Sequence, residues 1–130
     1  NTQCKATYTL LFVVKPLPLI ELAASELVCS NDPSFTKIIN AGVTDVAQIS
    51  NYTYQWYLNG SIIPSATQYD LTVNTEGVYT CEVTHPNSCS RTRIVTVTAS
   101  NSATIEQISI NDLSDNNSIV VYVSGSGDYE

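Results

Sequence analysis

The chain has 130 residues, which suits one domain of ordinary size or one domain with parts of its neighbours. Its 12 acidic and 5 basic residues give a formal net charge of −7, which argues against nucleic acid and anionic membranes as partners, because both are bound through clusters of Lys and Arg. Apolar residues make up 43% of the chain, as is normal for a folded core, and charged residues only 13%.

The N-terminal part begins with a predicted strand and a proline-rich connection. Residues 5–14 are rich in Thr, Leu, Val and Phe and alternate loosely, as a strand should. Pro16 and Pro18 then lack the donor that a sheet requires, so we expect 15–18 to be a linker between two domains, with a proline bend inside a first strand as the alternative. The same prolines interrupt the apolar run 10–22, which is too short to span a bilayer.

The following eighty residues have the pattern of short strands separated by turns. No segment sustains a 3.6-residue period, although 43–50 could form a short helical turn or a loop. Asn59-Gly60 is the strongest turn signal, because a type I′ hairpin turn needs positive φ at both central positions. The strands expected in this part are 19–24, 26–30, 36–39, 52–58, 61–63, 68–73, 78–84 and 89–98.

Four of these residues occur in the order Cys…Trp…Tyr-x-Cys, namely Cys29, Trp56, Tyr79 and Cys81. In the immunoglobulin sandwich a buried Trp packs on a bridge between the two sheets, and a Tyr two residues before the second Cys makes a corner. We therefore expect 19–98 to be an all-β, immunoglobulin-like β-sandwich with Trp56 and Tyr79 in its core.

Four cysteines in a β-rich chain predict an oxidising compartment and a disulfide. The favoured bridge joins Cys29 to Cys81 across the two sheets, beneath Trp56. Cys89 opens the last expected strand of the domain and could take Cys29 instead, and Cys4 could have a partner outside this chain.

After residue 98 the strand pattern starts again. Two further strands are expected at 104–110 and 119–123, joined by a polar loop. Shifting the sequence by about 85 residues aligns the N-terminal strand with 89–98, so 1–18 would hold the last strand of a preceding, similar domain. We therefore expect a piece of a tandem array, with the sandwich 19–98 between partial neighbouring domains at 1–18 and 99–130.

Candidate sites are few. His85 is the only histidine and the carboxylates are scattered, so neither a catalytic triad nor an acid/base pair is supported, and we expect no enzyme activity and no cofactor. Asp112 and Asp115 could hold Ca²⁺, but the favoured interpretation is a solvated loop whose side chains cap their own turns. Tyr57 and Tyr69 could stack on a sugar, but ordinary cross-strand packing is favoured.

Four stretches, YQWYLNG, EGVYTCEV, SCSRTRIVTV and SNSATIEQISINDLSDNNSIVVYVSGSGDYE, resemble the immunoglobulin-like repeats of giant cell-surface adhesins of gliding Bacteroidota. Such proteins typically end in a type IX secretion signal of type B. The resemblance implies export, an extracellular position on the cell surface with anchoring to the outer membrane through other parts of the parent protein, and a role in adhesion or gliding motility. Because such repeats carry an apolar residue at the position of Cys81, it also favours the pair Cys29–Cys89.

We therefore expect a non-enzymatic extracellular repeat module that spaces and displays adhesive domains. Its partners would be adjacent repeats of the same chain and surface polysaccharide or other cells, without nucleic acid binding and without membrane insertion. Two alternatives stay open, namely a carbohydrate-binding accessory domain of a secreted enzyme and a fibre subunit that assembles by strand exchange.

Overall fold

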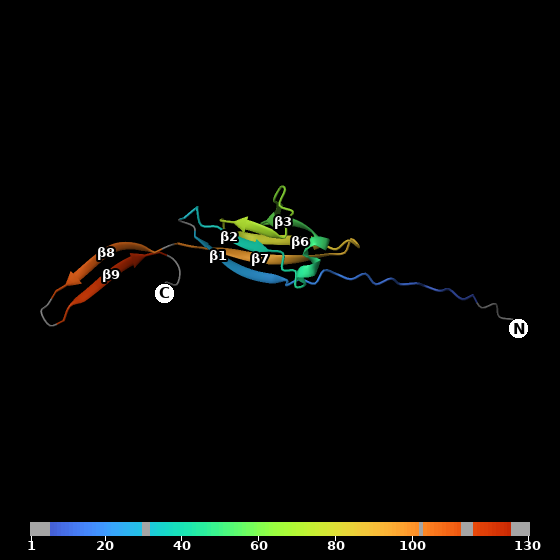
Figure 1. The fold of residues 1–130 in the computed structure, drawn as a ribbon, viewed down its shortest axis with the longest axis horizontal. Coiled ribbons are helices and arrows are strands. Elements are labelled where there is room, and N and C mark those ends of the chain that lie inside the picture. Colours follow the sequence, from blue (N-terminus) through green and yellow to red (C-terminus); the bar gives the residue numbers. More distant parts are fainter. Residues whose placement is uncertain (1–5, 30–31, 102, 113–115, 126–130) are drawn as a thin grey trace.

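The computed structural model describes residues 6–29, 32–101, 103–112 and 116–125. Within these ranges the chain forms nine strands and one short 3₁₀ helix, so the predicted all-β fold class is confirmed (Figure 1). The elements are β1 (Ala23–Cys29), β2 (Lys37–Asn40), η1 (Val46–Asn51), β3 (Thr53–Leu58), β4 (Ser61–Ile62), β5 (Asp70–Val73), β6 (Gly77–Thr84), β7 (Ser90–Ser100), β8 (Thr104–Asn111) and β9 (Ser118–Ser124).

The largest sheet has the strand order β1-β7-β6-β3-β4. Strand β1 runs parallel to β7, whereas the β7–β6, β6–β3 and β3–β4 pairs are antiparallel. Successive side chains of a strand point to opposite faces. The face of this sheet that turns inward is apolar apart from Arg93. The inward side chains of the three central strands are Tyr54, Trp56, Tyr79, Cys81, Val83, Arg93, Val95 and Val97.

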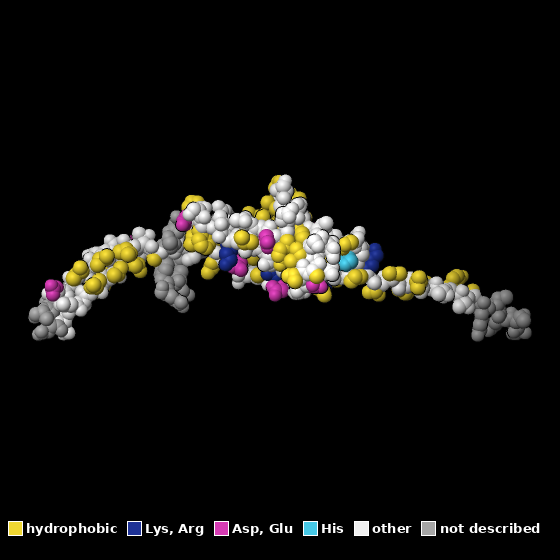
Figure 2. All heavy atoms as spheres, in the orientation of Figure 1, with side chains coloured by type: hydrophobic (Ala, Val, Ile, Leu, Met, Phe, Trp, Pro, Cys, Tyr) yellow, Lys and Arg dark blue, Asp and Glu magenta, His cyan; other side chains and the backbone are white. Residues whose placement is uncertain are grey.

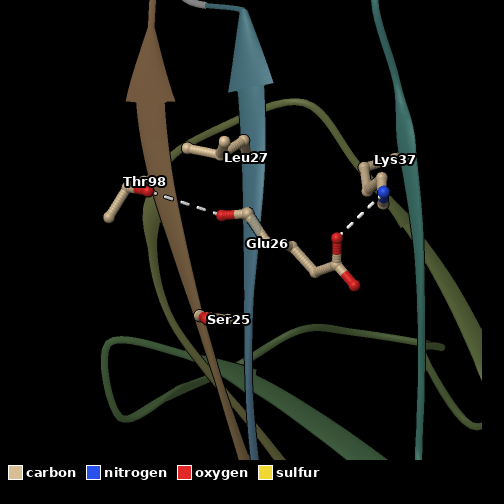
Figure 3. A pocket seen from close by; sticks show the side chains of 5 residues that line it. All are labelled: Ser25, Glu26, Leu27, Lys37 and Thr98. Atoms are coloured by element: carbon tan, nitrogen blue, oxygen red, sulfur yellow. Dashed lines mark hydrogen bonds and ion pairs between the residues drawn. The ribbon is translucent and has the colours of Figure 1, made fainter. Parts of the chain in front are cut away.

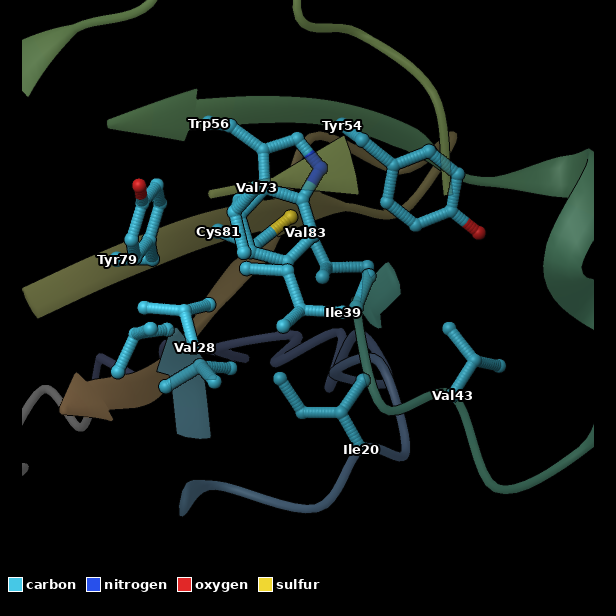
Figure 4. Close-up of a cluster of buried hydrophobic side chains, with 13 residues drawn as sticks. Ile20, Val28, Ile39, Val43, Tyr54, Trp56, Val73, Tyr79, Cys81 and Val83 are labelled. Carbon is cyan, nitrogen blue, oxygen red and sulfur yellow. The ribbon is translucent and has the colours of Figure 1, made fainter. Parts of the chain in front are cut away.

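A second, two-stranded sheet supplies the other side of the core. Strands β2 and β5 pair antiparallel, with Ile39 opposite Leu71. Ile39 and Val73 are buried and join the apolar face of the larger sheet in one cluster (Figure 4). An isolated bridge between Ile20 and Val43 extends this cluster towards the N-terminal side.

The predicted strands 19–24 and 26–30 are wrong as two separate strands. The structure has one strand here, β1, which pairs with β7 over its whole length, from Ala23 opposite Ile94 to Cys29 opposite Ser100. The strand that packs across the core is instead β2 (Lys37–Asn40), which overlaps the strand expected at 36–39. Alternation correctly indicates extended chain, but it does not say which neighbour a strand pairs with.

The local turn signals were accurate. Leu58 pairs with Ser61, and the two residues between them, Asn59 and Gly60, have φ angles of 49° and 82°, as a type I′ turn requires. The ambiguous stretch forms η1, whose first turn is capped by Asp45, since its carboxylate accepts a hydrogen bond from the backbone N–H of Ala47 at 3.0 Å.

The five-stranded sheet and the β2–β5 sheet pack together, and we call this part of the molecule the body. Two segments extend from opposite ends of the body (Figure 1). The strand predicted at 5–14 is absent from its described part: residues 6–19 have no strand partner, and Tyr8 and Val14 are 87% and 92% exposed. At the other end β8 and β9 pair with one another as a separate two-stranded sheet, exposed on both faces. Residues 6–19 form no strand because no strand of the described chain lies beside them to pair with their backbone groups.

Candidate functional site

The core is organised around the pair formed by Trp56 on β3 and Cys81 on β6, which lie directly opposite one another. Both side chains are fully buried. The indole Nε1–H of Trp56 donates to the backbone oxygen of Gln68 at 2.9 Å, so its one polar atom is satisfied. Tyr79 is also buried, and its hydroxyl donates to the backbone oxygen of Thr75 at 2.9 Å, which is a tyrosine corner.

The predicted Cys29–Cys81 bridge is not present, and both thiols are free. Strands β1 and β6 belong to the same sheet with β7 between them, which puts their backbones about 10 Å apart. A disulfide requires Cα atoms within about 7 Å. In addition, Cys29 lies opposite Ser100 and Cys81 opposite Arg93, so the two cysteines are also displaced along the strands.

The alternative bridge, Cys29–Cys89, is not formed either, because Cys89 is also a free thiol. Cys89 immediately precedes Ser90, the first residue of β7, whereas Cys29 lies beside Ser100, the last one. The two cysteines therefore lie at opposite ends of the body. Cys4 lies outside the described residues.

Cys81 behaves as a small apolar core residue. Burial raises the pKa of its thiol from 9.0 to about 12, so the thiol stays protonated even at moderately alkaline pH. A protonated, buried thiol is a poor nucleophile and a poor metal ligand. Ile39 on β2, across the core, supplies an apolar side chain to the same cluster.

The two tyrosines proposed for sugar stacking are not brought together. Tyr69 packs edge-on against Tyr54, with ring centroids 5.8 Å apart and an interplanar angle of 71°, and burial raises the pKa of its hydroxyl. Tyr57 is half-buried and follows Trp56 on β3, so it points to the opposite face of the large sheet. They therefore form no common platform.

The calcium candidate is described only in part. Asp112 is exposed directly after β8, and Asp115 lies outside the described residues. Across the described part of the chain, no three His, Cys, Asp or Glu side chains gather closely enough to hold a metal ion.

One hollow lies at the seam between the sheets, where β1 and β2 approach one another (Figure 3). It has a volume of about 400 Å³. The ammonium group of Lys37 lies 2.9 Å from the carboxylate of Glu26, and Thr98 donates to the backbone oxygen of Glu26 at 3.5 Å. The charges in this hollow therefore satisfy each other.

A larger cleft of about 610 Å³ lies where the N-terminal segment leaves the body, and we call it the linker cleft. Three segments line it: 15–19, 45–52 and 85–91. Figure 2 shows the cyan histidine side chain beside the dark blue colour that marks Lys and Arg, at this end of the body. Its polar and aromatic lining residues are Lys15, Asp45, Gln48, Tyr52, His85 and Arg91.

Asn87 holds two of these segments together. Its side-chain oxygen accepts from the backbone N–H of Cys89 at 2.9 Å, which closes the turn between β6 and β7. Its side-chain N–H donates to the backbone oxygen of Pro16 at 2.9 Å, and its backbone oxygen accepts from the ammonium group of Lys15 at 3.1 Å. The N-terminal segment is thus fastened to the turn, a contact between residues about seventy positions apart that no local pattern could predict.

No family model and no curated protein matches this chain. Among the described residues, no helix has the length and apolar character needed to cross a membrane.

Proposed function

We propose that this chain is a non-enzymatic repeat module of an extracellular cell-surface adhesin, built on an immunoglobulin-like β-sandwich. The observation that carries the proposal is the strand order β7-β6-β3-β4 facing β2 and β5. It corresponds to the order G-F-C-C′ of an immunoglobulin sheet facing strands B and E. The fully buried Trp56 on β3 and the hydrogen bond from Tyr79 on β6 to Thr75 support this assignment, because the fold has a buried Trp and a tyrosine corner on the corresponding strands.

The missing bridge is compatible with this assignment. In antibody domains a disulfide joins strands B and F beneath the Trp. Here β6 supplies Cys81, but β2 supplies the apolar Ile39, so the two sheets are held by hydrophobic packing. A module of this kind folds without oxidation, since its stability does not depend on a cross-link.

The extended segments at the two ends support a role in series, as a spacer. Residues 6–19 leave one end of the body, and the β8–β9 hairpin continues from the other (Figure 1). On this proposal 1–18 belongs to the preceding module, 19–98 is the complete sandwich, and 99–130 begins the next module. Adhesion and gliding motility, export by type IX secretion and anchoring through the rest of the parent protein follow from the resemblance given above.

Surface labelling tests the proposal. An antibody raised against the 130-residue chain should decorate intact, non-permeabilised cells that produce the parent protein, and deletion of the parent gene should reduce attachment to surfaces. Labelling that requires permeabilisation would contradict an extracellular role. Normal attachment by the deletion strain would contradict an adhesive one.

A fibre subunit that assembles by strand exchange is the second candidate, and one observation favours it. The apolar segment 7–14 and both edges of the β8–β9 hairpin lack a strand partner within the described chain, and they lie at opposite ends of the molecule. Residues 1–19 carry two lysines and no acid, whereas 101–130 carry five acids and no base. The N-terminal end of one copy therefore attracts the C-terminal end of another. Sedimentation of the purified chain separates the candidates: a spacer stays monomeric, whereas a strand-exchange subunit forms polymers that deletion of 7–14 abolishes.

A further inference from the structure

The linker cleft collects the cations that have no carboxylate partner. Four of the five basic residues are described. Lys37 pairs with Glu26, and Arg93 pairs with Glu21. The other two, Lys15 and Arg91, have no ion pair with any described residue, and both line this cleft. In a protein of net charge −7, two unpaired cations in one hollow favour an anionic ligand.

The other polar groups of the cleft present mainly hydrogen-bond donors. The side-chain oxygen of Gln48 already accepts from Asn51 at 3.0 Å, which leaves its two amide N–H groups for a ligand. His85 Nδ1 accepts from the backbone N–H of Asn87 at 3.1 Å, so the neutral ring carries its hydrogen on Nε2. Asp45, the one acid of the cleft, uses its carboxylate to cap η1.

An aromatic pair completes the lining. The rings of Tyr52 and His85 lie 5.5 Å apart with an interplanar angle of 48°, and both side chains are half-buried. Aromatic faces of this kind stack on the C–H groups of sugars, whereas a bare inorganic anion makes no use of them. The volume of about 610 Å³ lies within the range of about 300–1,000 Å³ that is usual for small-molecule sites.

We propose that the linker cleft binds a carboxylated oligosaccharide of the uronic acid class. One sugar ring stacks on Tyr52, its carboxylate lies between Lys15 and Arg91, and its hydroxyls accept from Gln48 and the Nε2–H of His85. The linker supplies Lys15 and the sandwich supplies the remaining groups, so the site exists only while the linker is fastened by Asn87. This inference goes beyond the proposed spacer role and does not depend on it.

The test is calorimetric titration of the full chain with tetragalacturonate at low ionic strength, with cellotetraose as the neutral sugar of equal length. We expect binding of the acidic sugar alone. Arg91→Gln and Lys15→Gln should each weaken it about tenfold, because each removes a charge-assisted hydrogen bond. Lys37→Gln is the matched control: it also removes one positive charge, but at the distant seam of β1 and β2, and should leave the affinity unchanged.

Several results would overturn the proposal. The first three are no binding of tetragalacturonate, equal binding of cellotetraose, and an affinity unaffected by Lys15→Gln. The fourth is equally tight binding of tetraglutamate, which would identify an acidic peptide as the ligand. Arg91 is half-buried, so its variant also needs an unchanged melting temperature to count. Lys15 lies in the linker outside the sandwich core, so its variant decides the matter even if Arg91→Gln unfolds.

Discussion

Gly42 lies directly against the guanidinium group of Arg93, and a Cβ atom at position 42 would overlap it. Arg93 is only 5% exposed, and its Nη1 donates to the backbone oxygen of Glu21 at 2.9 Å and to its carboxylate at 3.2 Å. Its Nε has no partner among the described residues. Arg93 on β7 thus binds Glu21, which precedes β1, and so holds this part of the chain against β7. Its buried guanidinium group fits there only because residue 42 has no side chain.

Gly42→Ala should therefore destabilise the fold by about 2–4 kcal/mol. Its φ of 71° costs an L-residue about 1–2 kcal/mol, and displacement of Arg93 adds a further overpacking cost. Gly60→Ala is the control, because Gly60 has a similar φ of 82° but nothing within 4 Å of its added methyl group. Urea denaturation of both variants measures the difference, and equal losses would show that the contact with Arg93 contributes nothing.

Tyr79→Phe should lower the free energy of unfolding by about 1 kcal/mol. The substitution keeps the buried ring but removes the hydrogen bond to Thr75. Tyr57→Phe removes the same atom from the outer face of the sheet, where water replaces any lost contact, and should change stability by a few tenths of a kcal/mol at most. Thermal unfolding of the two variants checks this, and an equal effect would argue against a tyrosine corner.

Stability should fall at alkaline pH. Burial raises the pKa of Cys81 to about 12 and that of Tyr54 to about 12, above their ordinary values of 9.0 and 10.0. Between its ordinary and its raised pKa, each group has lost its proton in the unfolded chain but keeps it in the folded chain. In that pH range the free energy of unfolding therefore falls by up to about 1.4 kcal/mol per pH unit for each group. Below pH 8 both groups are protonated in both states and contribute no slope.

Cys81→Ala isolates the thiol in this measurement. The variant should lose about 1–2 kcal/mol from its smaller core side chain, and its stability should decline less steeply than that of the native chain between pH 9 and 10. Denaturation curves at several pH values for both proteins give the two slopes. Identical slopes would mean that the thiol ionises as easily in the folded chain as in the unfolded one.

Hydrogen exchange should separate the β8–β9 hairpin from the five-stranded sheet. The amides of β6 and β7 lie inside a five-stranded sheet and should exchange only on global unfolding, whereas an isolated two-stranded hairpin is marginal in water. We expect the amides between β8 and β9 to exchange orders of magnitude faster at low protein concentration. Protection of β8 that grows with concentration would instead indicate pairing with a second copy.

The sequence by itself determined the local structure. Period-two alternation defined β6 and β7, the Asn59-Gly60 pair formed the predicted type I′ turn, and Trp56 and Tyr79 lie in the core. These features depend on the φ preferences and side-chain polarity of residues close together in the chain, and both can be read directly from the order of amino acids.

Only the tertiary structure decided which distant segments meet. Strand β1 pairs with β7, which places Cys29 beside Ser100 and leaves every described cysteine unbridged. The same packing brings Lys15 and Arg91 into one cleft. Strand pairing is set by how well complete apolar faces fit together, and this depends on all strands at once, so no single segment carries the information.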